Sequence, residues 1–72
     1  MFFILEIQGY VDGTFTQLIV QKPTIEEAEA DYYRVLSAAA TSGLPVHGAT
    51  ILDDHMKQRA GKCYNRVIQA NE

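Results

Sequence analysis

Hydrophobic and polar residues alternate in two stretches near the start of the chain. Phe2–Gly9 and Phe15–Lys22 are both rich in aromatic and β-branched residues, which favour strands. Asp12-Gly13 lies between them and is a turn signal, so the pattern predicts a β-hairpin. Alternation in the first strand puts Phe3, Leu5 and Ile7 on one face and Phe2, Ile4, Glu6 and Gln8 on the other. The pattern leaves open which face is buried.

A helical period follows from Thr24 to Ser42. Thr24 suits the N-cap position, and Glu27 three residues later completes a capping box. Gly43 stands where a helix C-terminus prefers glycine, and Pro45 follows it. The apolar residues at three- and four-residue spacing, which define the face expected to pack on the sheet, are Ile25, Ala28, Tyr32, Val35, Leu36 and Ala39.

The rest of the chain returns to strand-like composition. A third strand is expected over Val46–Leu52, followed by a turn at Asp53-Asp54. The fourth strand is expected to begin at His55 or Met56 and to end at Val67. The order ββαββ predicts an α+β fold, a four-stranded and mostly antiparallel sheet with one helix on one face. No linker or repeat interrupts it, so residues 1–72 are expected to form a single domain.

The size of the chain predicts a partner. Hydrophobic residues make up 47 % of the 72 residues and charged residues 21 %, which is typical of a folded protein. A domain this small buries only about 60 % of the surface of its unfolded chain, so disulfides, a metal or oligomerisation usually add stability. The lone Cys63 allows no internal disulfide, and two histidines with one cysteine make no zinc site. No cofactor is expected. We therefore expect a homo-oligomer.

One helix is expected to cover one face of a four-stranded sheet, and the uncovered face is a second reason to expect a partner. The helix also ends in small residues, Ala38 to Ser42, which permit a close neighbour. That neighbour is the sheet, a second copy of the chain or a ligand, and the sequence leaves the three open.

Charge is unevenly distributed along the chain. The net charge of −3 disfavours bulk nucleic-acid binding, and acids crowd the first half of the helix. Four basic residues instead occupy a stretch without acids: Lys57, Arg59, Lys62 and Arg66. Lys57 and Arg59 are expected to share a strand face, as a phosphate-bearing ligand would require. A solvated strand face is the alternative interpretation.

Aromatic residues beside basic ones are the other candidates for ligand contact. Adjacent helix positions are about 100° apart, so Tyr32 belongs to the packed face while Tyr33 and Arg34 flank it. Tyr33 could stack on a planar group and Arg34 could hold an anion in its planar fork. The alternative is that Arg34 is merely solvated.

His47 lies just after the predicted helix C-terminus, where a protonated imidazole is favoured. A lone histidine is more often a hydrogen-bonded structural residue; catalysis would need a nucleophile and an orienting acid, and the sequence flags neither. His55 is expected in a turn, and Cys63 is expected as a small buried residue next to Tyr64. No P-loop, GxGxxG, HExxH or GxSxG pattern occurs, so we expect no enzyme and assign no catalytic residue.

The N-terminus reads as a strand, because Glu6 and Gln8 interrupt its apolar run and it lacks a basic segment ahead of that run. No run approaches the roughly 20 apolar residues needed to cross a bilayer. The cytoplasm is the expected compartment, with no membrane partner.

Four segments together resemble a group of short proteins encoded in phages and prophages of Gram-positive, gut-type bacteria. They are FFILEIQGYVDGTFTQLIV, EAEADYYRVLSAAATS, LPVHGATIL and KCYNRV. The resemblance covers nearly the whole chain but rests mostly on structural motifs, and the chain departs from the group at Tyr33, where histidine is expected.

The resemblance implies a phage protein with a non-enzymatic accessory role, in the cytoplasm of the bacterial host. By analogy, such proteins are similar in style to counter-defence sponges, homo-oligomers that sequester cyclic-nucleotide or ADP-ribose-type immune signals. Tyr33 or Tyr64 would then stack on a base. The other ligand-binding candidates are Arg34, His47, Lys57, Arg59 and Lys62. The alternative is a protein-binding inhibitor or a structural accessory of the phage particle.

Overall fold

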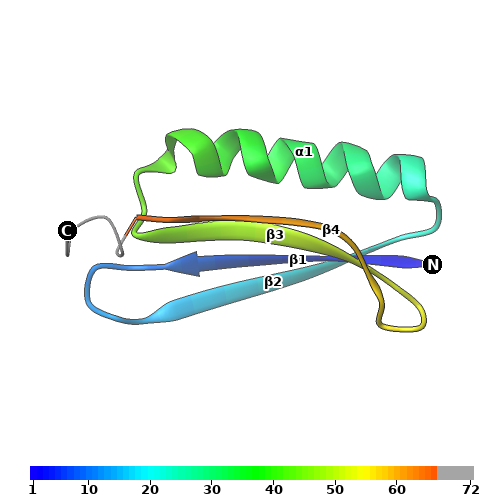
Figure 1. Cartoon of the computed structure of the whole chain (residues 1–72), viewed down its shortest axis with the longest axis horizontal. Coiled ribbons are helices and arrows are strands. Elements are labelled where there is room, and N and C mark those ends of the chain that lie inside the picture. The colour runs from blue at the N-terminus through cyan, green and yellow to red at the C-terminus, as the bar shows by residue number, and fades with distance from the viewer. Residues whose placement is uncertain (67–72) are drawn as a thin grey trace.

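The elements follow one another in the predicted order in a computed structural model, which describes residues 1–66 (Figure 1). β1 (Phe2–Gly9) and β2 (Phe15–Lys22) form the hairpin, and α1 (Ile25–Ser42), β3 (Val46–Asp53) and β4 (Gln58–Asn65) complete the fold. The described strands form one sheet in the order β2-β1-β3-β4, antiparallel throughout. The α+β ββαββ prediction, with one helix on one face, is confirmed.

The turn and cap residues act as their sequence positions predict. Asp12 accepts hydrogen bonds from the backbone N–H and the hydroxyl of Thr14, and Gly13 has a φ of 88° in the β1–β2 turn. The hydroxyl of Thr24 accepts the N–H of Glu27 at 3.2 Å and caps α1. Gly43, with a φ of 72°, ends the helix in the left-handed conformation.

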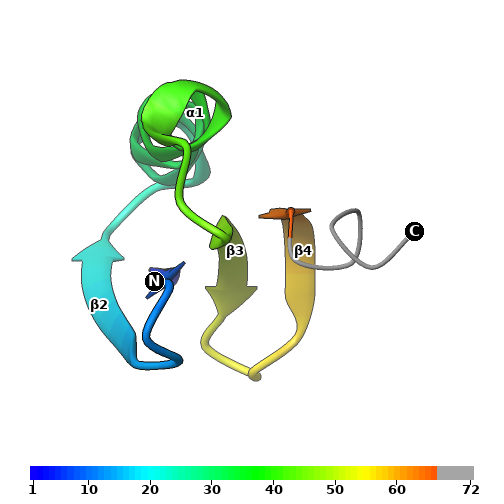
Figure 2. The same ribbon diagram turned by 90° about the vertical axis from the view of Figure 1, so that its left-hand side faces the viewer.

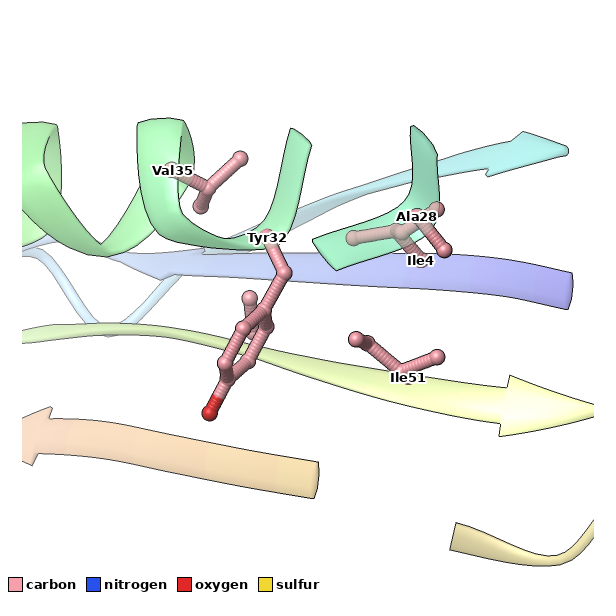
Figure 3. Close-up of a cluster of buried hydrophobic side chains, with 6 residues drawn as sticks. Ile4, Ala28, Tyr32, Val35 and Ile51 are labelled. Atoms are coloured by element: carbon pink, nitrogen blue, oxygen red, sulfur yellow. The ribbon is translucent and has the colours of Figure 1, made fainter. Parts of the chain in front are cut away.

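The helix settles which face of the sheet is buried. Ile4 and Ile51, paired across β1 and β3, are the largest fully buried residues of the sheet, and Ala28, Tyr32 and Val35 of α1 pack with them (Figure 3). All six residues of the predicted helix face are buried or partly buried. The helix lies mainly over the two central strands, β1 and β3 (Figure 2).

The side chains that alternate with this core lie on the opposite side of the sheet, which we call the open face. Paired residues point to the same side, so Phe3, Leu5 and Ile7 share the open face with Phe15 and Ile19 of β2. The helix-side row of each strand belongs to what we call the covered face. Among residues 1–66, no helix is long and apolar enough to cross a membrane.

The connection between β3 and β4 differs from the prediction. β3 extends one residue further, to Asp53, and β4 begins at Gln58. One oxygen of the Asp53 carboxylate accepts the N–H groups of His55 and Lys57, which holds residues 54–57 in a turn. His55 lies in that turn, as expected. The predicted end at Val67 lies outside the described residues.

The burial predicted for Cys63 is wrong. It is exposed rather than buried, because it pairs with Gly48 on the open face while Tyr64 points to the covered face. Alternation along β4 separates these neighbours onto opposite sides of the sheet.

Candidate functional site

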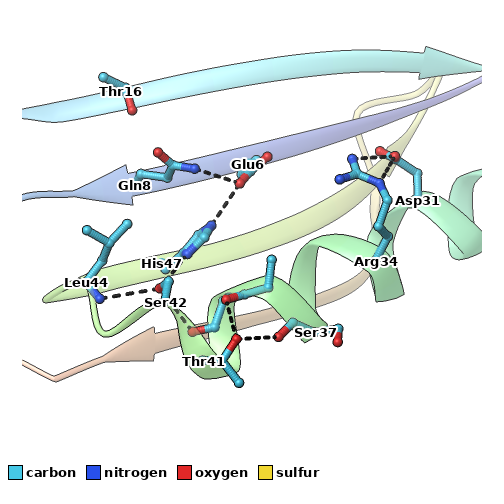
Figure 4. A network of polar contacts seen from close by, with 12 residues as sticks. Glu6, Gln8, Thr16, Asp31, Arg34, Ser37, Thr41, Ser42, Leu44 and His47 are labelled. Carbon is cyan, nitrogen blue, oxygen red and sulfur yellow. Dashed lines mark hydrogen bonds and ion pairs between the residues drawn. The ribbon is translucent and has the colours of Figure 1, made fainter.

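A chain of hydrogen bonds runs across the covered face beside the apolar core (Figure 4). The His47 ring, 3 % exposed, contacts the Glu6 carboxylate with Nε2 at 2.8 Å and the Ser42 hydroxyl with Nδ1 at 2.9 Å. Gln8 donates to the same Glu6 oxygen at 3.0 Å, and the Tyr10 hydroxyl donates to Gln8 at 2.7 Å. The network therefore ties β1, β3 and the end of α1 together.

Geometry limits the protonation states of His47. A carboxylate only accepts, so Nε2 carries a proton toward Glu6. In the neutral ring the Ser42 hydroxyl donates to Nδ1; in the charged ring Nδ1 donates to Ser42, whose proton then reaches the Ala39 carbonyl at 3.3 Å. Both states keep the ring hydrogen-bonded, so the network accommodates a proton without leaving a buried group unpaired.

Glu6 is held in its charged form. Burial by itself raises the pKa of its carboxyl, but the hydrogen bonds from His47 and Gln8, together with the charges of His47 and Arg34, outweigh burial and lower the pKa below 4.5. Its side chain is only 15 % exposed. An acid this enclosed requires partners, and the fold supplies them.

Ser42, His47 and Glu6 have the order of a hydrolase triad: hydroxyl, imidazole, carboxylate. Their surroundings oppose that chemistry. Ser42 ends α1, where carbonyl oxygens and the negative pole of the helix disfavour a developing oxyanion. The N–H of Leu44 donates to the Ser42 hydroxyl itself rather than to a position beside it. The arrangement fits a structural network better than a nucleophile.

Sequence reasoning missed both partners of His47. Glu6 alternates with Ile4 on the side of β1 that the helix covers, and an acid at a core-facing position signals a buried partner. The sequence places Glu6 on the same side of β1 as Ile4, but the packing of the helix was needed to show that this side is the covered one. The choice of His47 as the partner required the pairing of Gln8 with His47, which only the sheet register supplies.

Arg66 closes the carboxyl end of α1. Its guanidinium donates to the Leu44 carbonyl at 2.7 Å and to the Ala39 and Ala40 carbonyls at 2.9 and 3.2 Å. The last turn of the helix contains no basic residue of its own, so a cation from beyond β4 satisfies its free carbonyls. Ala39 is fully buried, whereas Ala38, Ala40, Thr41 and Ser42 are exposed, so the sheet is the close neighbour of Ala39 alone among these residues.

The same guanidinium lies beside an aromatic residue and a second cation. Lys62 Nζ is 5.0 Å from the centroid of the Tyr64 ring, and Arg66 Cζ is 5.3 Å from it. Both distances are within cation–π range. Neither cation forms an ion pair with an acid in residues 1–66. We call Lys62, Tyr64 and Arg66 the cationic cluster.

The other predicted ligand-binding residues lie outside the cationic cluster. Arg34 is paired with Asp31 at 2.8 Å and lines a shallow hollow with Lys22, Glu27 and Ala30. Tyr33 is 61 % exposed, with its ring 5.3 Å from that of Tyr32. His47 has both ring nitrogens occupied inside the protein.

The expected pairing of Lys57 with Arg59 on one strand face is wrong. Lys57 precedes β4, and Arg59 lies at a register shift where β4 has an extra residue opposite Ile51 and Leu52. Arg59 Nη1 is 3.5 Å from Asp53 Oδ2, so an acid of the same chain already faces its charge. The predicted ligand residues are therefore distributed over separate regions. Lys62 contacts the Tyr64 ring, and Tyr64 is paired with His47 across β4 and β3.

Within residues 1–66, no group of three or more His, Cys, Asp or Glu side chains is placed to hold a metal ion. The chain matches no protein-family model, no curated protein and no solved structure.

Proposed function

We propose that the protein is a non-enzymatic binding protein that sequesters an anionic, nucleotide-like molecule in the cytoplasm of a bacterial host, as a phage counter-defence sponge. The observation that carries the proposal is the cationic cluster. Lys62 and Arg66 are two cations without acidic partners in the described chain, and both contact one aromatic ring. A planar base and a phosphate together need such an aromatic surface with cations beside it.

The comparison with the other basic residues supports this choice. Arg34 and Arg59 already face Asp31 and Asp53, so an incoming phosphate would compete with a carboxylate there. At the cationic cluster a phosphate competes with none. Arg66 also keeps its place through three carbonyl contacts, which reduces the entropy that ligand binding would cost.

Isothermal titration against a panel of cyclic di- and trinucleotides and ADP-ribose tests the proposal. Lys62→Gln is expected to weaken binding about tenfold, because one charge-assisted phosphate contact is lost. Lys22→Gln removes a cation on the far edge strand, β2, and serves as the matched control with unchanged affinity. A clean absence of binding across the panel, or equal losses in both variants, would contradict the proposal.

A second candidate is contact with a host or phage protein. The exposed acids Glu26, Glu27 and Glu29 on the first half of α1 favour a basic protein partner. Pull-down from host lysate with mass spectrometry tests it. A stoichiometric partner that the double variant Glu26→Lys/Glu29→Lys fails to retain would favour this candidate over the sponge.

A further inference from the structure

The open face of the sheet carries no charge. Its strand positions, taken from the pairing register, are Phe3, Leu5, Ile7 and Gly9 on β1, Phe15, Gln17, Ile19 and Gln21 on β2, Val46, Gly48, Thr50 and Leu52 on β3, and Gln58, Gly61, Cys63 and Asn65 on β4. None of them is an aspartate, glutamate, lysine, arginine or histidine. Phe15 and Ile19 are each 63 % exposed to solvent. Within residues 1–66, a monomer presents this mostly apolar surface to water.

The face is also uneven. Leu5, Ile7 and Phe15 border a hollow of about 510 Å³ whose other walls include Gly48, Gly61 and Cys63. The hollow exists because glycines replace side chains on β3 and β4, whereas β1 and β2 carry large apolar side chains. One half of the face is therefore raised and the other half is recessed.

We infer that the open face binds the open face of a second copy of this chain, with the two-fold axis parallel to the strands. Such an axis places β2 of each copy over β4 of the other, so the raised half of each face enters the recessed half of its partner. An uncharged surface meets its own copy without like-charge repulsion, although the whole chain carries a net charge of −3.

The area is sufficient for such a dimer. Four strands of eight residues span roughly 19 by 27 Å at standard strand spacing and rise, or about 500 Å² of flat sheet in each copy. Two copies together bury about 1,000 Å², and side-chain relief increases this figure, so the contact reaches the lower bound for a specific interface. Sheets packed face to face in this way are a common architecture.

A matched pair of variants on β2 tests the inference. Ile19→Lys puts a charge on the open face, and Leu18→Lys puts the same charge on the adjacent residue, which is 55 % exposed on the other side of the sheet. Because both residues are exposed, neither change removes the core. Wild type and Leu18→Lys are expected to be dimers by native mass spectrometry and light scattering. Ile19→Lys is expected to self-associate at least roughly a hundredfold more weakly, because its charge would be buried without a partner.

Cys63 reports the same interface independently, because it is exposed in the single chain and lies on the open face. Its reaction with a thiol reagent is expected to be slow in the wild-type dimer and to become faster on dilution and in Ile19→Lys. Circular dichroism confirms that each variant is folded. A wild type that is monomeric at all concentrations overturns the inference, as does a dimer that Ile19→Lys and Leu18→Lys weaken equally. A monomer with a protected Cys63 also overturns it and shows that another part of the chain covers the face.

Crosslinking tests the direction of the axis. Gln17, Ile7, Gly48 and Cys63 form one row across the sheet, so the proposed axis brings Gln17 over Cys63 of the second copy. The Gln17→Cys variant is expected to form a disulfide-linked dimer under oxidation, and the additional change Cys63→Ser is expected to abolish that dimer if the new thiol pairs with Cys63. A dimer that does not crosslink in this way overturns the orientation. Ligand binding at the cationic cluster, on the opposite side of the sheet, is measured separately.

Discussion

The two faces of the sheet differ in where their charged residues lie. The covered face holds the core and also the ionisable residues of the strands, with Glu6 and His47 paired beneath the end of the helix. The open face is uncharged and mostly apolar, although nothing in the described chain covers Phe15 or Ile19. A solvated face of an antiparallel sheet normally carries polar side chains.

This difference indicates how each face obtains its stability. The enclosed charge of Glu6 is compatible with burial because His47 is its partner, and the guanidinium of Arg66 donates to carbonyls at the end of the helix. The described side chains of the open face are uncharged and mostly apolar, which favours stabilisation by apolar contact. Substitutions that affect one face and spare the other separate these two sources of stability.

The largest effect is expected from the covered face. Ile51→Ala removes a fully buried side chain and leaves a cavity, with an expected loss of about 2–5 kcal/mol in the free energy of unfolding. Leu52→Ala, the next residue but on the open face and only partly buried, is expected to cost less in dilute protein. Urea denaturation measures both. Equal losses would contradict the assignment of the core to one side.

Two glycines on the open face differ in what an added Cβ would meet, which is backbone at Gly48 and mainly a side chain at Gly61. A Cβ at Gly48 would lie 2.6 Å from the Cys63 Cα and the Lys62 carbonyl, so Gly48→Ala must push two strands apart, at a cost of about 1–3 kcal/mol. At Gly61 the closest atom is the flexible end of Gln58, which can shift, and the next is the Thr50 hydroxyl oxygen at 3.1 Å, a tight contact but a milder one than the backbone contacts at Gly48. Thermal unfolding is expected to show a clear loss for Gly48→Ala and a smaller change for Gly61→Ala. The reverse order would refute the close approach of β4 to Gly48.

The pH dependence of the free energy of unfolding tests the pairing of Glu6 with His47. The pKa of Glu6 is lowered in the folded protein, so its contribution to stability is present above the unfolded value of 4.5 and is lost as the pH falls through the folded pKa. Glu6→Gln keeps a hydrogen-bond acceptor for His47 but not the charge, and is expected to cost about 1 kcal/mol at neutral pH. The variant is expected to lose less stability than wild type between neutral and acidic pH. Parallel pH profiles would show that Glu6 is not held in its charged form.

Local patterns were enough to predict the elements and their order. Thr24 and Gly43 mark the helix ends, Asp12-Gly13 marks the hairpin, and the spacing of Ala28, Tyr32 and Val35 identifies the buried stripe. These signals act through neighbours in the chain, which is why they can be read without a structure. The prediction of the β3–β4 turn was less accurate, because the backbone of Asp53 continues the strand while its side chain holds the turn.

The candidate sites depended on contacts between distant residues. His47 and Glu6 are 41 positions apart, and Arg66 reaches a carbonyl 27 positions earlier. Composition suggested one basic face. In the structure, Arg59 lies at a register shift, and Arg34 and Arg59 are each paired with an acid. Lys62 and Tyr64 are predicted ligand residues that do contact each other. No periodicity in the sequence contains that information.

By itself, the sequence determined the ββαββ order, the buried stripe of the helix and the two alternating sets of strand residues, because capping, turn preference and side-chain periodicity are local properties. Only the tertiary structure decided which set the helix covers, and with it which residues meet. The helix can bury either face of the sheet as far as alternation is concerned. Its packing on Ile4 and Ile51 leaves Phe3, Leu5 and Ile7 uncovered and brings His47 to Glu6.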